Sequence, residues 1–262
     1  RVLPGNFTST MTRGDVGGGQ LDVSGFVRQL TTRVYMPTIR WRHDGPVWKA
    51  EAGAALSRSS FKDRDVDKGF FQSNNARRTN VTILFDDIFY LRPRVITVTD
   101  AATGQPVNPY VLDSMALVSG VSTQTDFNDA QRSAYANLRR DFSWRVPFTL
   151  KGGFDLQQSL RDTRGRNQTY NFVGPDGRAS TTPGASDDAA APFVNVTFVN
   201  EPASFGFPGV PRLSPWAVYE AYRDHPTWFT TNATTNHTNS VNRSKRADEL
   251  ISSAYLRGDV SF

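Results

Sequence analysis

Alternating acidic residues come closest to a metal-binding pattern in this sequence. They are Asp63, Asp65 and Asp67. Carboxylate oxygens suit Ca²⁺, but the calcium loop of an EF-hand requires glycine at its sixth position and glutamate at its twelfth. Counted from the first of these aspartates, those positions hold Lys68 and Asn74. We therefore expect a solvated acidic turn and no bound metal.

The sequence offers no set of residues that would support nucleophilic or acid–base catalysis. The histidines are isolated in turn-like and polar segments, at His43, His225 and His237. The chain contains no cysteine, which removes thiol nucleophiles, thiolate metal sites and disulfides. Serine and aspartate occur in every polar segment, so no Ser-His-Asp order can be assigned. The sequence predicts neither an enzyme nor a cofactor site.

Aromatic residues in the polar region 162–249 are the candidates for ligand binding. They are Trp216, Tyr219, Tyr222 and Trp228. Flat rings offer a stacking surface for a sugar or another ring-shaped ligand, but they equally serve to pack a segment onto its neighbours. Ser214-Pro215 has the pattern of a helix N-cap followed by proline at the first helical position, which predicts a short helix to about His225.

The elements that position these residues are predicted from alternating hydrophobicity. Between Phe148 and Arg161 the even-numbered residues are apolar, except Gln158, and the odd-numbered ones are mostly polar. Side chains of a strand point alternately to its two faces, so this strand has one apolar and one polar face. Similar alternation predicts five long strands, at residues 32–42, 47–59, 131–142, 148–161 and 253–262.

The connections between these strands differ greatly in length. Short turns are expected near 43–46 and 143–146, and long connections near 60–129 and 162–249. We expect the first turn to bring Trp41 opposite Trp48. The long connections contain only short strand-like pieces, at 80–85 and 94–99, and the helix described above. Residues 1–29 are expected to be loop, with a weak strand from Leu21.

Two features favour a membrane barrel over a soluble sheet. Transmembrane β-barrels combine short turns at one end with long loops at the other, whereas soluble sandwiches turn every 8–12 residues. Aromatic residues also gather at the short-turn end, where an interfacial girdle belongs. They are Trp41, Trp48, Phe142, Trp144 and Phe148. The residues between them on the same face, including Ala52, Leu150, Phe154, Leu156 and Leu256, are expected to face lipid.

Charged residues on the other face are expected to line a polar lumen. They are Arg40, Lys49, Glu51, Arg139, Lys151 and Asp155. Charges of both signs also suit the exposed face of a soluble sheet, so these residues do not separate the two classes. The predicted fold is all-β: an antiparallel, up-and-down sector of a transmembrane β-barrel, with residues 1–262 forming part of one barrel domain. Five strands are an odd number, so we expect a sector of a larger barrel and an interior piece of a longer protein.

Composition excludes several other classes. The net charge of +5 comes from 30 basic and 25 acidic residues, and no basic run exceeds two residues, so nucleic acid is not an expected partner. No run of about 18 apolar residues is present that would predict a membrane-spanning helix.

Several segments together resemble one family of membrane proteins. They are Arg78–Thr82, Arg94–Asp100 with Thr103–Pro106, Ala136–Phe142, Thr169–Pro175 and Tyr255–Asp259. Their order and spacing are similar to the central barrel of TonB-dependent outer-membrane receptors. The resemblance covers most of residues 30–262 and implies a location in the outer membrane of a Gram-negative-type bacterium. The family's plug domain and energy-coupling box have no counterpart in these residues.

The resemblance also implies partners. In that family a barrel surrounds a plug, the outer loops and the plug bind a scarce nutrient such as a siderophore–iron complex or an oligosaccharide, and an inner-membrane energy-transducing complex acts on the plug. Outer-membrane lipid, the plug and that complex are therefore expected partners of the parent protein. Residues 60–129 and 162–249 would be the extracellular loops, and the lumen charges would contact the plug. The alternatives are a secreted β-sheet protein that binds carbohydrate and a passive porin.

Overall fold

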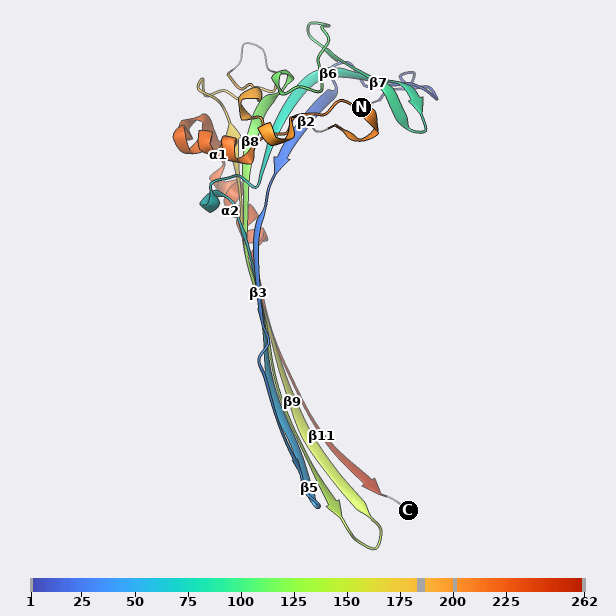
Figure 1. The fold of residues 1–262 in the computed structure, drawn as a ribbon, viewed down its shortest axis with the longest axis vertical. Helices are drawn as coiled ribbons and strands as arrows, with labels where there is room; N and C mark the ends of the chain where they lie inside the picture. The colour runs from blue at the N-terminus through green and yellow to red at the C-terminus, as the bar shows by residue number, and fades with distance from the viewer. Residues whose placement is uncertain (1, 183–186, 200–201, 261–262) are drawn as a thin grey trace. The chain divides into compact units, whose positions relative to one another are not determined.

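The computed structural model describes residues 2–182, 187–199 and 202–260. β-strands account for 57% of the structure, and they form one antiparallel sheet (Figure 1). The all-β prediction is therefore confirmed. The expectation of about five strands is wrong, because the sheet has 11 strands, and the sheet is not closed. No helix in the described part of the chain is long and apolar enough to cross a membrane.

The chain divides into two compact units. Unit 1 comprises Arg1–Gln29, Arg64–Thr123 and Asn167–His237, and unit 2 comprises Leu30–Asp63, Gln124–Arg166 and Thr238–Phe262. Because β8 (Ala116–Phe142) and β9 (Phe148–Phe172) are long, each contributes residues to both units.

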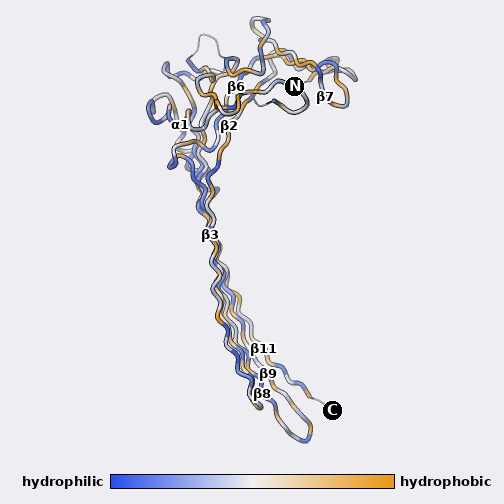
Figure 2. Tube along the Cα trace, viewed as in Figure 1, coloured by the Kyte–Doolittle hydropathy of each residue, from blue (hydrophilic) through white to orange (hydrophobic). Residues whose placement is uncertain are grey.

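Unit 2 is built from long antiparallel strands. β3 (Gln29–Tyr35), β4 (Thr38–Asp44), β5 (Trp48–Arg64) and β11 (Lys245–Val260) join the relevant parts of β8 and β9. Both β3 and β4 pair with β5, β5 pairs with β8, β8 with β9, and β9 with β11. The alternation of hydrophilic and hydrophobic residues along these strands is visible in Figure 2. Four of the five predicted alternating segments lie in single strands, whereas 32–42 is divided at Met36-Pro37 between β3 and β4. The last strand ends at Val260, with 261–262 outside the described residues.

The short turns of unit 2 lie where they were predicted, but one strand register differs. β4 ends at Asp44 and β5 begins at Trp48, and the peptide N–H of Gly45 donates to the carbonyl oxygen of Trp48 at 2.9 Å. Trp41 lies opposite Ala52, so the expected pairing of Trp41 with Trp48 is wrong. The register is shifted by four residues. An even shift keeps every side chain on its face, so the two apolar faces still coincide.

Unit 1 contains strands that were predicted only in part, as a weak strand from Leu21 and short pieces at 80–85 and 94–99. They are β1 (Thr12–Arg13), β2 (Gly19–Phe26), β6 (Ser73–Phe89), β7 (Arg92–Asp100) and β10 (Phe229–Thr231). The prediction that residues 60–129 are irregular is therefore wrong, because β5, β6, β7 and β8 occupy most of them. Region 162–249 is also partly strand, since β9 continues to Phe172 and β11 begins at Lys245.

Buried polar residues explain why β6 was not recognised as a long strand. The peptide N–H of Gly25 donates to Oδ1 of buried Asn74 at 2.9 Å. Arg78 is buried as well, and its guanidinium binds the carboxylate of Asp100, the last residue of β7, at 2.7 Å. A buried polar group is tolerated when its hydrogen bonds are made within the protein. These residues face the interior although their types predict exposure.

The helix prediction is confirmed. α1 spans Pro215–Asp224, and Oγ of Ser214 accepts a hydrogen bond from the N–H of Ala217 at 3.2 Å, as an N-cap does. A second helix, α2 (Ala233–Asn242), was not expected because it has no apolar face. Its first turn is instead capped by Asn232, whose Oδ1 accepts from the N–H of Thr235 at 2.9 Å.

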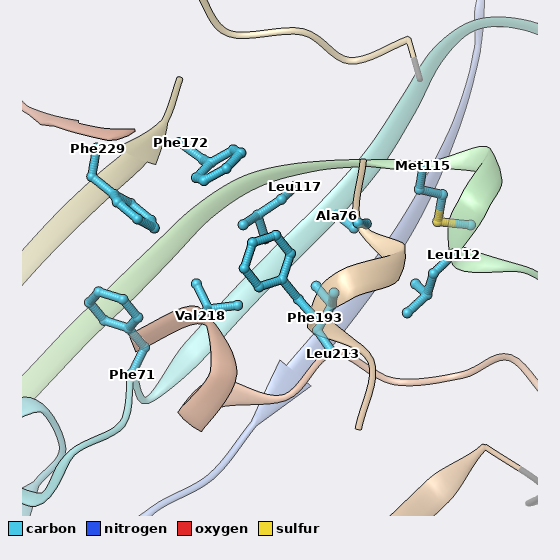
Figure 3. Close-up of a cluster of buried hydrophobic side chains, with 11 residues drawn as sticks. Phe71, Ala76, Leu112, Met115, Leu117, Phe172, Phe193, Leu213, Val218 and Phe229 are labelled. Atoms are coloured by element: carbon cyan, nitrogen blue, oxygen red, sulfur yellow. The ribbon is translucent and has the colours of Figure 1, made fainter. Parts of the chain in front are cut away.

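The hydrophobic core of unit 1 lies between its strands and α1 (Figure 3). Its buried members are Phe71, Ala76, Leu112, Met115, Leu117, Phe172, Ala190, Phe193, Leu213, Val218 and Phe229. Phe71 and Val218 are fully buried, and the ring of Phe71 lies 5.1 Å from that of Tyr170. Such close aromatic packing fixes the loops of unit 1 onto its strands.

Candidate functional site: the two faces of the unit 2 sheet

The first face of the unit 2 sheet is apolar and open. We call it the apolar face: the odd-numbered residues of β4 and the even-numbered residues of β5, β8, β9 and β11, as their register requires. Large side chains on it are exposed, including Ile39 at 73%, Phe154 at 52% and Leu256 at 76%. A shallow groove of about 330 Å³ runs across it, lined mainly by Trp41, Ala52, Leu138 and Phe154. Large exposed apolar patches mark surfaces that meet a partner or a membrane.

An aromatic cluster closes the apolar face at the short-turn end. The ring of Phe142 lies 5.5 Å from that of Trp144 and 5.6 Å from that of Phe148. Arg140, the one basic residue that interrupts the alternation here, places its guanidinium 4.9 Å from the ring of Trp48 and 4.6 Å from that of Phe142. Its charge is therefore held over aromatic faces near the end of β8.

A row of polar side chains closes the apolar face at the other end. Nη1 of Arg132 donates to Oε1 of Gln158 at 3.1 Å, and Nε2 of Gln158 donates to Oδ1 of Asp248 at 3.0 Å. These three residues come from β8, β9 and β11. Gln158, the exception in the predicted alternation, is the middle of this row. The apolar face is thus a band with a polar limit at one end and an aromatic limit at the other.

The second face, the polar face, carries linked charges. Glu51 accepts from the hydroxyl of Tyr135 at 2.8 Å and lies 3.0 Å from the guanidinium of Arg40. Asp141 forms a second centre, at 2.7 Å from Nε of Arg139 and 3.6 Å from Nζ of Lys49. In each centre a carboxylate binds nearby basic side chains. Asp141 lies beside Lys49 and Arg139, which the register places directly opposite each other and whose like charges would otherwise repel.

A small polar groove lies between these centres. It has a volume of about 210 Å³ and is lined by Arg42, Lys49, Glu51, Asn137, Arg139 and Lys151, among others. Next to it, the hydroxyl of Tyr255 donates to Oδ1 of Asn137 at 2.8 Å, and Nζ of Lys151 lies 5.8 Å from the Tyr255 ring. Five of the six charged residues predicted for this face therefore lie in these two centres or along this groove. The sixth, Asp155, is on the same face opposite Ser253.

Two tyrosines on the polar face pack over glycines of the neighbouring strand. A Cβ atom on Gly53 would lie 2.6 Å from Cε1 of Tyr135, and one on Gly153 would lie 2.8 Å from Cε1 of Tyr255. A glycine in a strand often marks such a close approach, and a ring laid over it restores the missing packing. Tyr135 lies on the polar face opposite Gly53, a contact that the sequence analysis did not predict. Gly53 is the residue from which this contact could have been predicted.

The aromatic residues predicted to bind a ligand lie in unit 1 and are partly used in packing. Tyr219 and Tyr222 contact the ring of Phe71, at 5.6 and 5.8 Å between centroids. Trp228 lies against Phe172 and stacks on His225 at 4.0 Å. Trp216 is 44% exposed, with one edge near Phe70. Of the four, Trp216 therefore offers the most surface to a ligand.

Tyr170, which packs against Phe71 and Tyr222, is partly shielded from water. Burial, together with the nearby hydroxyl of Tyr222, raises the pKa of Tyr170 to about 12. The Tyr170 hydroxyl donates to Oε1 of Gln168 at 2.9 Å. A phenol in such surroundings remains neutral at any physiological pH, so it contributes packing and a hydrogen bond rather than charge.

The acidic turn differs from its prediction. Asp63 and Asp65 are buried, so the expectation of a solvated turn is wrong for them. Asp65 accepts hydrogen bonds from the Ser122 hydroxyl at 2.8 Å and from the N–H groups of Thr123 and Val66, both at 2.6 Å. These donors compensate the carboxylate for its burial. Within the described ranges, no group of three or more acidic, histidine or cysteine side chains is arranged to hold a metal.

Comparison with known proteins gives no further identification. No family model, no curated protein and no solved structure matches this chain.

Proposed function

We propose that this chain is part of the outer-membrane β-barrel of a TonB-dependent receptor, which takes up a scarce nutrient by energy-coupled transport. The observation that carries the proposal is the exposed apolar band of unit 2, backed by a polar face on the same single layer of strands. In water such a surface is unfavourable, whereas the wall of a membrane barrel needs one face for lipid and one for a polar interior.

The length of the apolar band supports this assignment. Gln158, in the polar row, is ten residues beyond Phe148, at the aromatic end. At roughly 3.3 Å per residue this length is about 33 Å along the strand. Tilted by about 40°, as barrel strands are, it corresponds to about 25 Å across the membrane, which equals the usual height of the lipid-facing band.

The nature of the band's ends gives a second line of support. Trp48 and Trp144 are exposed at the short-turn end, and aromatic rings with a polar edge favour the lipid headgroup level. Trp41, which was expected at the same end, lies opposite Ala52 and lines the groove with Phe154, nearer the middle of the band. Arg140 lies against Trp48, where a long basic side chain can reach water from an apolar surface. Both features are typical of a membrane interface.

The receptor assignment, rather than a barrel of another kind, depends on the family resemblance. In that interpretation the linked charges around Glu51 and Asp141 contact the plug. Unit 1, with its exposed Trp216, takes part in capture of a siderophore–iron complex, an oligosaccharide or a similar ligand. Transport itself belongs to the parent protein with its plug and the inner-membrane complex.

Arginine substitutions in the intact parent protein, folded into phosphatidylcholine vesicles, test the membrane assignment. Phe154 is near the middle of the band, and we expect Phe154→Arg to lower the free energy of unfolding by about 2–4 kcal/mol. Leu156 is next to the polar row, so Leu156→Arg should cost about 0–1 kcal/mol, as at an interface. Gln157→Arg, on the polar face, is the matched control and should cost little.

The free-energy costs at positions 154, 156 and 157 distinguish a membrane barrel from a soluble sheet. A cost that falls from position 154 to position 156 supports a lipid-facing band. Equal tolerance at all three positions contradicts the barrel and favours the secreted carbohydrate-binding alternative. To separate a receptor from a passive porin, the intact parent protein is reconstituted in vesicles. Free diffusion of small sugars into them would contradict the receptor assignment.

A further inference from the structure

Four basic side chains, which we call the basic row, lie side by side across the polar face of unit 2. They are Lys49 of β5, Arg139 of β8, Lys151 of β9 and Arg257 of β11. The register places Lys49 directly opposite Arg139, and Lys151 directly opposite Arg257. The two pairs adjoin across β8 and β9, where the Thr149 hydroxyl donates to Oδ1 of Asp141 at 3.0 Å. Arg139 and Lys151, each two residues farther from the turn, are therefore neighbours and line the polar groove together.

The basic row is an unfavourable arrangement for the sheet itself. Like charges directly opposite each other on paired strands are destabilising. Neighbouring strands are about 4.8 Å apart, so four positive charges lie within roughly 14 Å across the sheet. The pairing of the strands gains nothing from this row, which points to a role outside the fold.

Carboxylates compensate the basic row only in part. Asp141 is shared, at 2.7 Å from Nε of Arg139 and 3.6 Å from Nζ of Lys49. Asp259 lies 2.8 Å from the guanidinium of Arg257 on its own strand. Among the described residues Lys151 has no ion-pair partner, and its ammonium group lies 5.8 Å from the ring of Tyr255. Four positive charges thus meet two negative ones, which leaves an excess of two.

The excess charge lies along the polar groove. Three members of the basic row line this groove, whose volume is about 210 Å³. The acidic residues that also line it, Glu51 and Asp44, are engaged by Arg40 and Arg42 at 3.0 and 2.8 Å. Sites for drug-sized ligands have volumes of about 300–1,000 Å³, so this groove suits a smaller solute. Ammonium and guanidinium groups bind phosphate oxygens through charge-assisted hydrogen bonds.

From this arrangement we infer that the basic row is a binding site for a small dianion, either free phosphate or the phosphate group of a small monoester. Its two negative charges would balance the excess, and its oxygens would accept hydrogen bonds from Lys49, Arg139 and Lys151. This inference goes beyond the proposed function, because it depends on the polar face and not on lipid at the apolar face. In a barrel, the site would lie in the lumen at the short-turn end.

Calorimetric titration of the intact parent protein with inorganic phosphate tests the inference. The protein is held in an uncharged detergent that contains no phosphate, and the buffer is alkaline so that inorganic phosphate is a dianion. Nitrate is the monoanionic control. We expect phosphate to bind more tightly than nitrate, and its binding to weaken with added salt, because exposed charges are screened.

Substitutions on β9 separate this site from general attraction of anions. Lys151→Gln should reduce the phosphate affinity about tenfold, as loss of one charged hydrogen bond does. Lys151→Arg keeps the charge and should bind phosphate nearly as the wild type does. Arg161→Gln is the matched control, because it removes one positive charge from the same face of the same strand, ten residues away. It should leave the affinity unchanged.

Asp141→Asn gives a prediction of opposite sign. The amide keeps the size of the side chain and removes the negative charge that Lys49 and Arg139 share. Phosphate should then bind several-fold more tightly than to the wild type. A gain in affinity cannot result from misfolding, so this variant complements the loss expected for Lys151→Gln.

Several outcomes would overturn the inference. Absence of phosphate binding would do so, and it is the result expected if acidic residues of a plug already occupy the basic row. Nitrate binding as tight as phosphate binding, or equal losses in Lys151→Gln and Arg161→Gln, would show only general attraction of anions. Unchanged or weaker binding by Asp141→Asn would contradict the charge balance described above. Each of these outcomes leaves the membrane assignment of the apolar face as it stands.

Discussion

Unit 1 buries its large apolar side chains and unit 2 exposes many of them, although β8 and β9 contribute residues to both units. In unit 1, Phe71 and Phe172 are buried in a core closed by α1 and short 3₁₀ segments. In unit 2, Phe154 and Leu256 project from a single layer of strands with most of their surface exposed. Exposure of this kind is unfavourable in water and normal in a bilayer. Under the proposed function, unit 2 meets lipid with its apolar face, whereas unit 1 buries its apolar side chains in a core of its own.

The two units also differ in where their polar residues lie. Unit 1 buries Asn74, Arg78 and Asp100 and gives each of them at least one internal hydrogen bond. Unit 2 keeps its charges on one face, where Glu51 and Asp141 are each surrounded by cross-strand partners. A single-layered sheet does not need to bury charge, because the pleat already separates polar from apolar side chains.

The largest expected effect concerns the core of unit 1. Phe71→Ala removes a fully buried ring and should lower the stability of unit 1 by about 3–5 kcal/mol, through lost transfer free energy and the remaining cavity. Phe89→Ala is the control in the same unit, because Phe89 is 59% exposed and should tolerate the change. Hydrogen exchange of peptides from α1 and β10 gives the measurement. Equal loss of protection in both variants would mean that unit 1 has no specific core at Phe71.

A smaller effect is expected at the tyrosine–glycine contact of unit 2. Gly53→Ala forces a Cβ against the Tyr135 ring and should cost about 1–3 kcal/mol, as overpacking does. Gly152→Ala is the matched control, since its Cβ would meet its nearest neighbour, Leu256 Cδ1, at an ordinary 3.5 Å. Unfolding of the vesicle-bound protein by urea measures both. If adding Tyr135→Ser reduces the free-energy cost of Gly53→Ala, the Tyr135 ring is the cause of that cost. Equal costs for Gly53→Ala and Gly152→Ala would show that the contact is unimportant.

The smallest effect is a pH dependence confined to unit 1. Arg78, with the N–H groups of Thr103 and Ala102, lowers the pKa of Asp100 to about 2 from its ordinary value of 3.8. A depressed folded-state pKa stabilises the fold above the unfolded pKa, and this contribution is lost as the pH falls through the folded pKa. Stability should therefore decline between about pH 4 and pH 2 through this group.

Asp100→Asn provides the comparison for that decline. The variant should be less stable than the wild type at pH 7, and the difference should vanish near pH 2. Hydrogen exchange of β6 and β7 peptides between pH 7 and pH 2 measures this difference in stability, and exchange in the paired strands β9 and β11 of unit 2 is the internal reference. A difference that persists at pH 2 would assign the stabilisation to hydrogen-bond geometry rather than to the Asp100 charge.

The sequence predicted unit 2 much better than unit 1. In unit 2 the two faces of the strands differ in polarity, so alternation from Phe148 to Leu156 indicates the faces directly, and even the exception at Gln158 corresponds to the end of the band. In unit 1 the interior contains Asn74, Arg78 and Asp65, whose burial depends on partners distant in the chain. No local pattern contains that information, so β6 and β7 were expected to be largely loop.

The candidate site shows the same division. Alternation assigned Arg40, Lys49 and Glu51 to one face, and the structure brings them to shared centres and a groove. It could not reveal that Tyr135 bridges to Glu51, because the pairing register decides which residues meet across strands. The aromatic residues around Trp216 were recognisable as a group, but their division between core and surface depends on how α1 packs on Phe71.

A cysteine scan along β9 tests most directly whether the apolar face meets lipid. The chain has no native cysteine, so each position from Phe148 to Arg161 can be replaced and labelled singly with a fluorophore. In phosphatidylcholine bilayers we predict that a lipid-soluble quencher acts at even-numbered positions from Phe148 to Leu156 and loses effect at Gln158. A water-soluble quencher should act at odd-numbered positions. Quenching that is the same at even and odd positions, or that continues unchanged past Gln158, would contradict a lipid-facing band.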